Sequence, residues 1–116
     1  MKLISVDKEN KQNFIDYVKE PTVTLILYYA DWCPHCTEFK PTWNELNKKY
    51  SRSKNVRLIE VEYDNMKHVP KKYSKHIRGF PTLNLVKDDK ILTEYNGHRN
   101  LDSLKDFIGK YTSKKN

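Results

Sequence analysis

A strongly apolar stretch runs directly toward the only two cysteines of the chain. Residues 23–29 are apolar or aromatic apart from one threonine, which is typical of a buried strand. Cys33 and Cys36 follow, and residues 37–50 then have the apolar spacing of an amphipathic helix. This order predicts that Cys33 lies at a helix N-terminus, where unpaired N–H groups and the helix dipole favour a thiolate over a thiol.

The two cysteines occupy different positions in this pattern. Cys36 lies one turn inside the helix, near enough to Cys33 to close a small disulfide ring. We therefore expect Cys33 to be the exposed thiol of lower pKa and Cys36 to be buried. Such a pair exchanges disulfides, and the rest of the chain is interpreted as its support.

The remaining chain alternates predicted strands and helices. Strands are expected at residues 3–6, 23–29, 56–63, 82–86 and 91–95, and helices at residues 8–20, 37–50, 66–73 and 101–111. The order β-α-β-α-β-α-β-β-α predicts a single α/β domain over residues 1–116. Its central sheet is expected to be mixed, with an antiparallel hairpin at one edge and helices on its flanks.

Local signals set the ends of these elements. Asp7, Asn65 and Asn100 are expected to cap the helices that follow them. Asp88 and Asp89 are expected to turn the chain between the two hairpin strands. The last helix is expected to bury one face, which carries Leu101, Leu104, Phe107, Ile108 and Tyr111.

The composition bounds the class of protein. A chain of 116 residues is long enough for a real core, and no stretch approaches the roughly 20 apolar residues of a membrane span. The net charge of +7 comes from 18 lysines against four arginines, scattered along the chain. A nucleic-acid surface or an acidic protein partner is one interpretation of this charge. Because arginine is scarce and no lysine run is interleaved with aromatic residues, we favour solubility, and we expect no specific nucleic-acid partner and a monomer.

The two ends of the sequence carry no recognisable address. Residues 1–7 lack the long apolar segment of a secretory signal, and residues 112–116 lack a retention tetrapeptide. We therefore expect a cytoplasmic, nuclear or virion-internal protein.

Three groups of residues carry a family resemblance. They are residues 28–36, Tyr-Tyr-Ala-Asp-Trp-Cys-Pro-His-Cys, with Pro41 five residues later; residues 78–83, Arg-Gly-Phe-Pro-Thr-Leu; and residues 95–99, Tyr-Asn-Gly-His-Arg, followed by Asp102 and Phe107. The chain resembles thioredoxin, and still more the catalytic domains of protein disulfide isomerases. The resemblance implies the thioredoxin fold and a thiol–disulfide oxidoreductase. Its substrates would be proteins with disulfides or thiols, it would need a redox partner, and its redox-active cysteines would replace any cofactor.

The resemblance also assigns roles to single residues. Cys33 matches the nucleophile that attacks a substrate disulfide, and Cys36 matches the resolving thiol. Pro81 matches a cis-proline that faces the two sulfurs, so the Phe80 backbone is expected to pair with an extended substrate. Arg99 matches a mobile arginine that eases deprotonation of the resolving cysteine; the alternative is a surface arginine after a turn.

The residues around the cysteines add two further expectations. Trp32 is expected to shield the cysteines, with ordinary packing as the alternative. Pro34 and His35 form the pair found between the cysteines of the bacterial periplasmic oxidant, whereas thioredoxin has Gly-Pro and disulfide isomerases have Gly-His. A histidine there stabilises the Cys33 thiolate and makes the protein a better oxidant. The alternative is a solvated residue at the helix start with little effect.

One position departs from the family. Thioredoxins have a buried aspartate, and disulfide isomerases a glutamate, six residues before the first cysteine, where this chain has Leu27. The partner lysine of that carboxylate lies four residues before the aspartate that ends the next strand, and counting back from Asp64 gives Glu60. We hypothesise that Glu60 is a relocated base for Cys36. The alternative is that Glu60 faces solvent.

Two other functions remain open at this point. The cysteines and two of His68, His76 and His98 would make a four-ligand metal site, although their spacing fits no known finger. A non-catalytic module that binds a client or a virion component is the other alternative. Within the enzyme class, the sequence leaves reduction, oxidation and isomerisation open.

Overall fold

A computed structural model describes residues 1–112; residues 113–116 lie outside the described part, and with them most of the segment in which no retention signal was expected. The strands are β1 (Ile4–Ser5), β2 (Val23–Tyr29), β3 (Val56–Glu62), β4 (Thr82–Lys87) and β5 (Lys90–Glu94). The helices are α1 (Lys11–Val18), α2 (Pro34–Tyr50), the 3₁₀ helix η1 (Tyr63–His68), α3 (Lys71–Ser74) and α4 (Leu101–Thr112). None of the helices in this part of the chain is both long and apolar enough to cross a bilayer.

The strands form one mixed sheet in the order β1-β3-β2-β4-β5. β3 is parallel to both β1 and β2, whereas β4 is antiparallel to β2 and β5 antiparallel to β4. Helices connect the parallel strands and a tight turn connects the antiparallel pair, as their geometry requires. This is the thioredoxin fold expected from the sequence.

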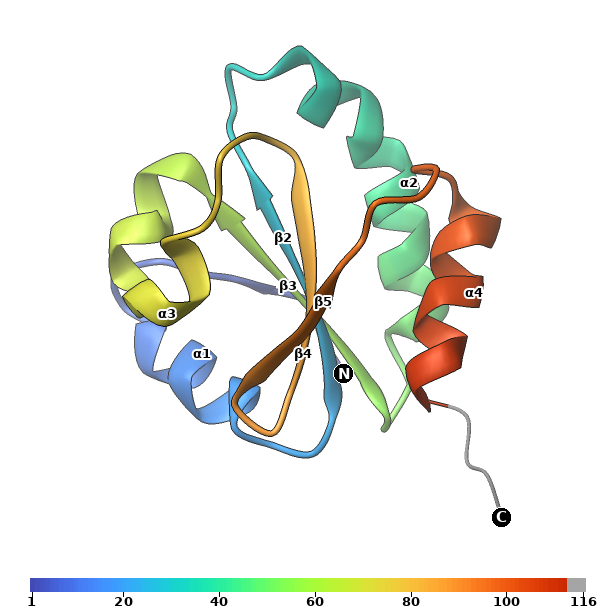
Figure 1. Cartoon of the computed structure of the whole chain (residues 1–116), viewed down its shortest axis with the longest axis horizontal. Coiled ribbons are helices and arrows are strands. Elements are labelled where there is room, and N and C mark those ends of the chain that lie inside the picture. Colours follow the sequence, from blue (N-terminus) through green and yellow to red (C-terminus); the bar gives the residue numbers. More distant parts are fainter. Residues whose placement is uncertain (113–116) are drawn as a thin grey trace.

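Each face of the sheet has its own core. Figure 1 shows α1 and α3 on one side of the sheet and α2 and α4 on the other. On the α2 side, Trp43 and Leu46 pack with Leu104 and Ile108 of α4. On the α1 side, the main helical contributions are Phe14, Val18 and Tyr73. β2 has six fully buried residues because it lies in the middle of the sheet and is covered on both faces.

Two expected caps are wrong. Asp7 accepts hydrogen bonds from the N–H groups of Glu9 and Asn10, so it closes a turn, and α1 begins only at Lys11. Asn65 lies inside η1, which is capped instead by the Glu62 carboxylate. The predicted helix over residues 66–73 is divided into η1 and α3, because Pro70 has no N–H to continue the first helix.

In the C-terminal part of the chain, the structure agrees more closely with the turn and the helix cap expected from the sequence. Asp88 and Asp89 both have positive φ, 53° and 63°, which is the conformation a two-residue hairpin turn requires. Asn100 caps α4, since its Oδ1 accepts the Ser103 N–H at 2.8 Å. Tyr111, however, is 38% exposed and not part of the buried face, although its ring packs on Phe107.

Candidate active site

Cys33 caps the N-terminus of α2 with its sulfur. Its backbone is extended (φ −95°, ψ 116°), and its Sγ accepts a hydrogen bond from the Cys36 N–H at 3.2 Å. Pro34 opens the helix, where the missing N–H of proline is no loss. The donated N–H is one of the groups that a helix start leaves unpaired, so the predicted place of Cys33 is confirmed.

Both thiols are buried, which corrects the expectation of an exposed Cys33. Cys33 is 6% exposed and Cys36 3%. They cluster with Ala30, and the rings of Tyr29 and Phe80 pack against this cluster. The local sequence pattern indicates a helix start but not its cover, because the Phe80 ring comes from a loop 47 residues further along the chain.

Burial raises the pKa of the Cys36 thiol from 9.0 to about 11. Desolvation is the largest cause, and the hydrogen bond with Cys33 adds to it. The backbone of Ala30 and the charge of Arg99 lower the pKa by smaller amounts. Cys36 is therefore a neutral thiol at neutral pH and must lose a proton before it can attack.

The Phe80–Pro81 peptide bond is cis, as expected. The carbonyl oxygen of Phe80 lies 3.6 Å from the Cys33 sulfur, whose thiol donates to it. The Thr82 hydroxyl donates to the Gly79 carbonyl at 2.7 Å and closes the loop around this bond. The backbone beside Pro81 is thus within contact distance of Cys33, where a second chain could pair with it.

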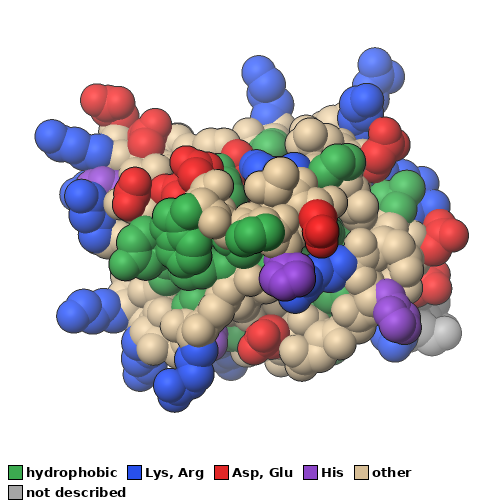
Figure 2. Space-filling view, turned by 90° about the horizontal axis from the view of Figure 1, so that it is seen from above, with side chains coloured by type: hydrophobic (Ala, Val, Ile, Leu, Met, Phe, Trp, Pro, Cys, Tyr) green, Lys and Arg blue, Asp and Glu red, His purple; other side chains and the backbone are tan. Residues whose placement is uncertain are grey.

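An aromatic triad, Trp32, Tyr63 and Phe80, lies beside Cys33. The three rings pack edge to face, with centroids 5.8 to 5.9 Å apart. Trp32 is 66% exposed and Tyr63 50%. Figure 2, which looks onto this end of the molecule, shows a contiguous hydrophobic patch. Trp32 therefore forms a surface beside the cysteines and covers them less than expected.

Tyr63 was missed by the sequence reasoning. It directly follows β3, and β3 is parallel to β2, which leads to the cysteines. Parallel strands end at the same edge of a sheet, so this position was within reach of a topological argument.

His35 lies in solvent at the start of α2. Its Nδ1 is 3.7 Å from the Glu38 carboxylate, and both side chains are more than 70% exposed. No hydrogen bond joins His35 to either sulfur in the described residues. Any effect of this imidazole on Cys33 therefore acts through its charge and not through a direct bond.

Glu60 pairs with Leu27 across the β2–β3 ladder, as the counting argument requires. Its side chain is 11% exposed, so it does not face bulk solvent. One carboxylate oxygen accepts the Trp43 indole N–H at 2.8 Å, and the other accepts the Ser5 hydroxyl at 2.6 Å. Lys40, one turn beyond Cys36, lies 3.5 Å from the carboxylate. Glu60 thus ties β1, β3 and α2 together.

Tyr29 packs close to the cysteines and to Lys40, the cation beside Glu60. Its ring packs on the cysteine cluster, and the Lys40 ammonium stands 4.1 Å from the ring centroid. Desolvation raises the pKa of Tyr29 to about 12, and the charges of Glu60, Asp31 and Glu62 add to this rise. Lys40 and Trp43 were not predicted as site residues, because their proximity to Glu60 depends on how α2 packs on the sheet. Tyr29, on β2, was not predicted as a site residue either.

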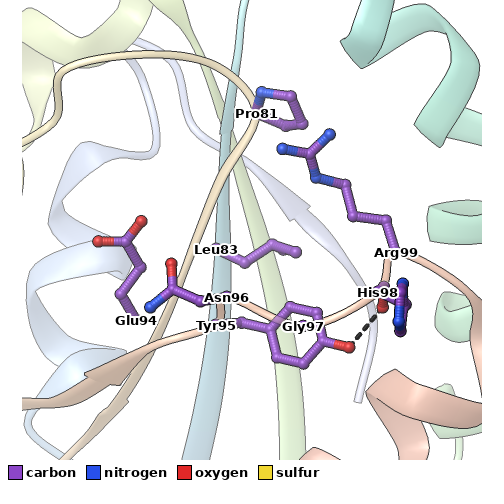
Figure 3. A pocket seen from close by; sticks show the side chains of 8 residues that line it. All are labelled: Pro81, Leu83, Glu94, Tyr95, Asn96, Gly97, His98 and Arg99. Atoms are coloured by element: carbon purple, nitrogen blue, oxygen red, sulfur yellow. Dashed lines mark hydrogen bonds between the residues drawn. The ribbon is translucent and has the colours of Figure 1, made fainter.

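Arg99 lies beside Pro81. It lines a surface hollow with Pro81, and Figure 3 shows its guanidinium extending toward the proline ring. The Tyr95 hydroxyl donates to the His98 carbonyl and fixes the turn that carries Arg99. Arg99 also lowers the Cys36 pKa through its charge, so the structure brings it into the electrostatic range of the Cys36 thiol.

The histidines do not gather around the cysteines. Among residues 1–112, no three His, Cys, Asp or Glu side chains are grouped as metal ligands would be. The Nε2 of His76 lies 3.1 Å from the Asn84 side-chain nitrogen instead. The described residues give the metal alternative no support.

The geometry can be compared with known proteins. The family model of thioredoxin matches residues 5–110. Protein disulfide-isomerase erp38 of Neurospora crassa is 35% identical over 108 residues, covering 89% of this chain and 28% of that protein. A putative protein disulfide-isomerase of Schizosaccharomyces pombe is 30% identical over 105 residues, covering 90% and 21%. This chain thus spans between about a fifth and somewhat over a quarter of these relatives.

Solved structures agree. A thioredoxin mutant from Halobacterium salinarum superposes with a TM-score of 0.74 at 28% identity, covering 99% of this chain and 95% of that one. Human ERp44 gives a TM-score of 0.79 at 28% identity, covering 95% and 33%. Fold, site and similarity therefore lead to one conclusion: the chain belongs to the thioredoxin family and is similar to the domains of protein disulfide-isomerases.

Proposed function

We propose that this chain exchanges disulfides with protein substrates through Cys33 and Cys36. The Cys33 thiolate attacks a substrate disulfide, forming a mixed disulfide and releasing one substrate sulfur as a thiol after it takes up a proton. Cys36 then loses its proton and attacks the Cys33 sulfur. The substrate leaves as a dithiol. Its two electrons come from Cys33 and Cys36, which are now joined as a disulfide.

The observation that carries the proposal is the asymmetry of the two thiols. A helix N–H points at the Cys33 sulfur, while burial keeps Cys36 protonated with a raised pKa. A sulfur with an N–H donor is favoured as a thiolate and attacks first. Cys36, as a protonated thiol, attacks only after the mixed disulfide has formed.

The test is catalysis of disulfide exchange. The full chain should accelerate reduction of insulin by dithiothreitol and refolding of reduced ribonuclease, whereas a module that only binds clients should do neither. The measured reduction potential of the Cys33–Cys36 pair then decides which direction the chain favours against a given redox partner.

The Pro34–His35 pair supports an oxidising potential within this proposal. A nearby imidazolium stabilises the reduced form through the Cys33 thiolate. Because His35 is exposed and paired with Glu38, its charge is partly screened. His35→Gln should make the potential more reducing, and Glu38→Gln should shift it the opposite way. An unchanged potential in both variants contradicts a role for His35.

Glu60 and Arg99 are proposed to serve the deprotonation of Cys36. Support for Glu60 is its pairing with Leu27 and its low exposure. Tyr29 packs on the cysteine cluster, and the Lys40 ammonium beside the Glu60 carboxylate stands over the Tyr29 ring. Support for Arg99 is the lowering of the Cys36 pKa by its charge. Glu60 is thus the proposed proton acceptor and Arg99 the proposed electrostatic partner.

A further inference from the structure

A hollow on the Arg99 side of the active site carries more positive than negative groups. Two cations, Arg78 and Arg99, line it, together with His76, which is counted as neutral at pH 7, and the cis-proline loop. Glu94 is its one acidic residue. Arg78 entered the sequence analysis only as part of the motif over residues 78–83, and the proposed exchange chemistry leaves it without a role.

The two arginines are available to a ligand. Both are exposed, and neither makes an ion pair within residues 1–112. Figure 3 shows the Arg99 guanidinium pointing toward Pro81, with the Glu94 carboxylate well apart from it in this view. Arg57 is the contrasting case, since it bonds Glu20 at 2.9 Å and stacks 3.6 Å over the Tyr17 ring. Arg57 is thus occupied by the fold itself.

The opposite border of the active site is acidic. Asp31, Glu62 and Asp64 lie next to the aromatic triad, and Glu62 accepts the N–H groups of the other two. Figure 2 shows Asp and Glu side chains along the upper border of the hydrophobic patch, with Lys and Arg side chains below it. A segment lying across Cys33 therefore meets negative charge on one side and positive charge on the other.

We propose that Arg78 and Arg99 form a subsite for a carboxylate side chain in the client segment that flanks the reacting cysteine. This rests on the proposed function, because the segment is placed by its bond to Cys33 and by the Phe80 carbonyl beside it. In an extended segment, residues two apart lie about 7 Å from each other on one face, so a side chain near the reacting cysteine reaches the hollow. Guanidinium groups bind carboxylates with paired hydrogen bonds, which gives the subsite its selectivity.

The experiment uses short peptides with one cysteine joined to a 2-thiopyridyl leaving group. Reduced full-length chain attacks the peptide sulfur, and the released pyridine-2-thione is followed by its absorbance. Three peptides differ only in having glutamate, glutamine or lysine near the cysteine, and each is made with that residue before or after it. For one of the two placements of the varied residue, before or after the cysteine, we expect the glutamate peptide to react about two- to fivefold faster than the glutamine peptide. The lysine peptide should be the slowest of the three.

Arg78→Gln is the deciding variant, and Arg52→Gln, just beyond the C-terminal end of α2, is its control. The glutamate preference should fall by about half or more in Arg78→Gln, persist in Arg52→Gln and fade at high ionic strength. Equal rates for all peptides, or a preference unchanged in Arg78→Gln, would overturn the subsite while leaving the exchange function intact. Absence of reaction with every peptide would overturn the proposed function and the subsite with it.

Discussion

The two sulfurs lie three residues apart in unlike surroundings. The Cys33 side has an N–H donor, a backbone carbonyl and an aromatic surface open to a second chain. The Cys36 side is closed, and desolvation raises the pKa of its thiol to about 11. Tyr29 packs on the cysteine cluster, and the charge of Glu60 adds to the rise of the Tyr29 pKa. The difference teaches that one helix start can favour the thiolate form of one cysteine while its neighbour stays a protonated thiol.

Serine substitutions break the comparison most strongly. Cys33→Ser should lower insulin reduction by more than about 10³-fold, because the attacking sulfur is removed. Cys36→Ser should still attack, and should accumulate mixed disulfides visible by mass spectrometry of alkylated samples. If Cys33→Ser traps clients as well as Cys36→Ser does, the two roles are reversed.

The pH dependence of substrate release by Cys36 sharpens the comparison between the two thiols. In the mixed disulfide Cys33 carries no charge, but the desolvation that raises the Cys36 pKa remains. Release of the substrate should therefore accelerate about tenfold per pH unit across the neutral and mildly alkaline range. Stopped-flow measurement on a preformed mixed disulfide checks this, and a release rate independent of pH contradicts it.

Glu60→Gln removes the charge; the amide oxygen keeps an acceptor for the Trp43 indole N–H, and the Ser5 hydroxyl can turn to accept from the amide NH2. Substrate release near neutral pH should slow by about tenfold, a modest effect for general-base catalysis because the path to Cys36 is indirect. Attack by Cys33 should stay nearly unchanged. Glu60→Asp should restore part of the rate.

The matched control for this variant is Glu45→Gln, an exposed carboxylate on the same helix as the cysteines. It should leave both steps unaltered. Unchanged release in Glu60→Gln would reject the relocated base and leave Glu60 as the residue that ties α2 to the sheet.

Arg99→Gln tests the smaller electrostatic contribution. Without this charge the Cys36 pKa rises further, so release should slow by about two- to fivefold, as befits an exposed cation. High ionic strength should reduce the difference from the parent chain. A larger loss in the attack step than in release would assign Arg99 to substrate binding alone.

The smallest effect concerns stability. The folded chain holds the Cys36 proton more tightly than the unfolded chain, since the pKa rises from 9.0 to about 11. This contribution is present below pH 9.0 and is lost as pH rises through about 11. Reduced protein should lose about 1 kcal/mol near pH 10, a few degrees in Tm, and Cys36→Ser should lose less over the same range. Equal losses in both proteins contradict the buried neutral thiol.

The sequence was sufficient for the fold because its elements are marked by apolar periodicity and strong turn residues. It also placed Glu60 beside Leu27 correctly, since register follows from counting along paired strands. It missed the partners of Glu60, which depend on how α2 packs across the sheet. It overestimated the exposure of Cys33 for the same reason: the covering Phe80 ring is distant in sequence.

The two borders of the sheet have a consequence for how clients can dock. β1 is only two residues long, and β5 begins and ends with the charged residues Lys90 and Glu94. Short or charged outer strands are poor templates for the growth of a sheet by another chain. An incoming extended segment is therefore discouraged from adding at either margin. The proposed pairing of a client with the Phe80 backbone next to Cys33 would therefore meet little competition from these two outer strands.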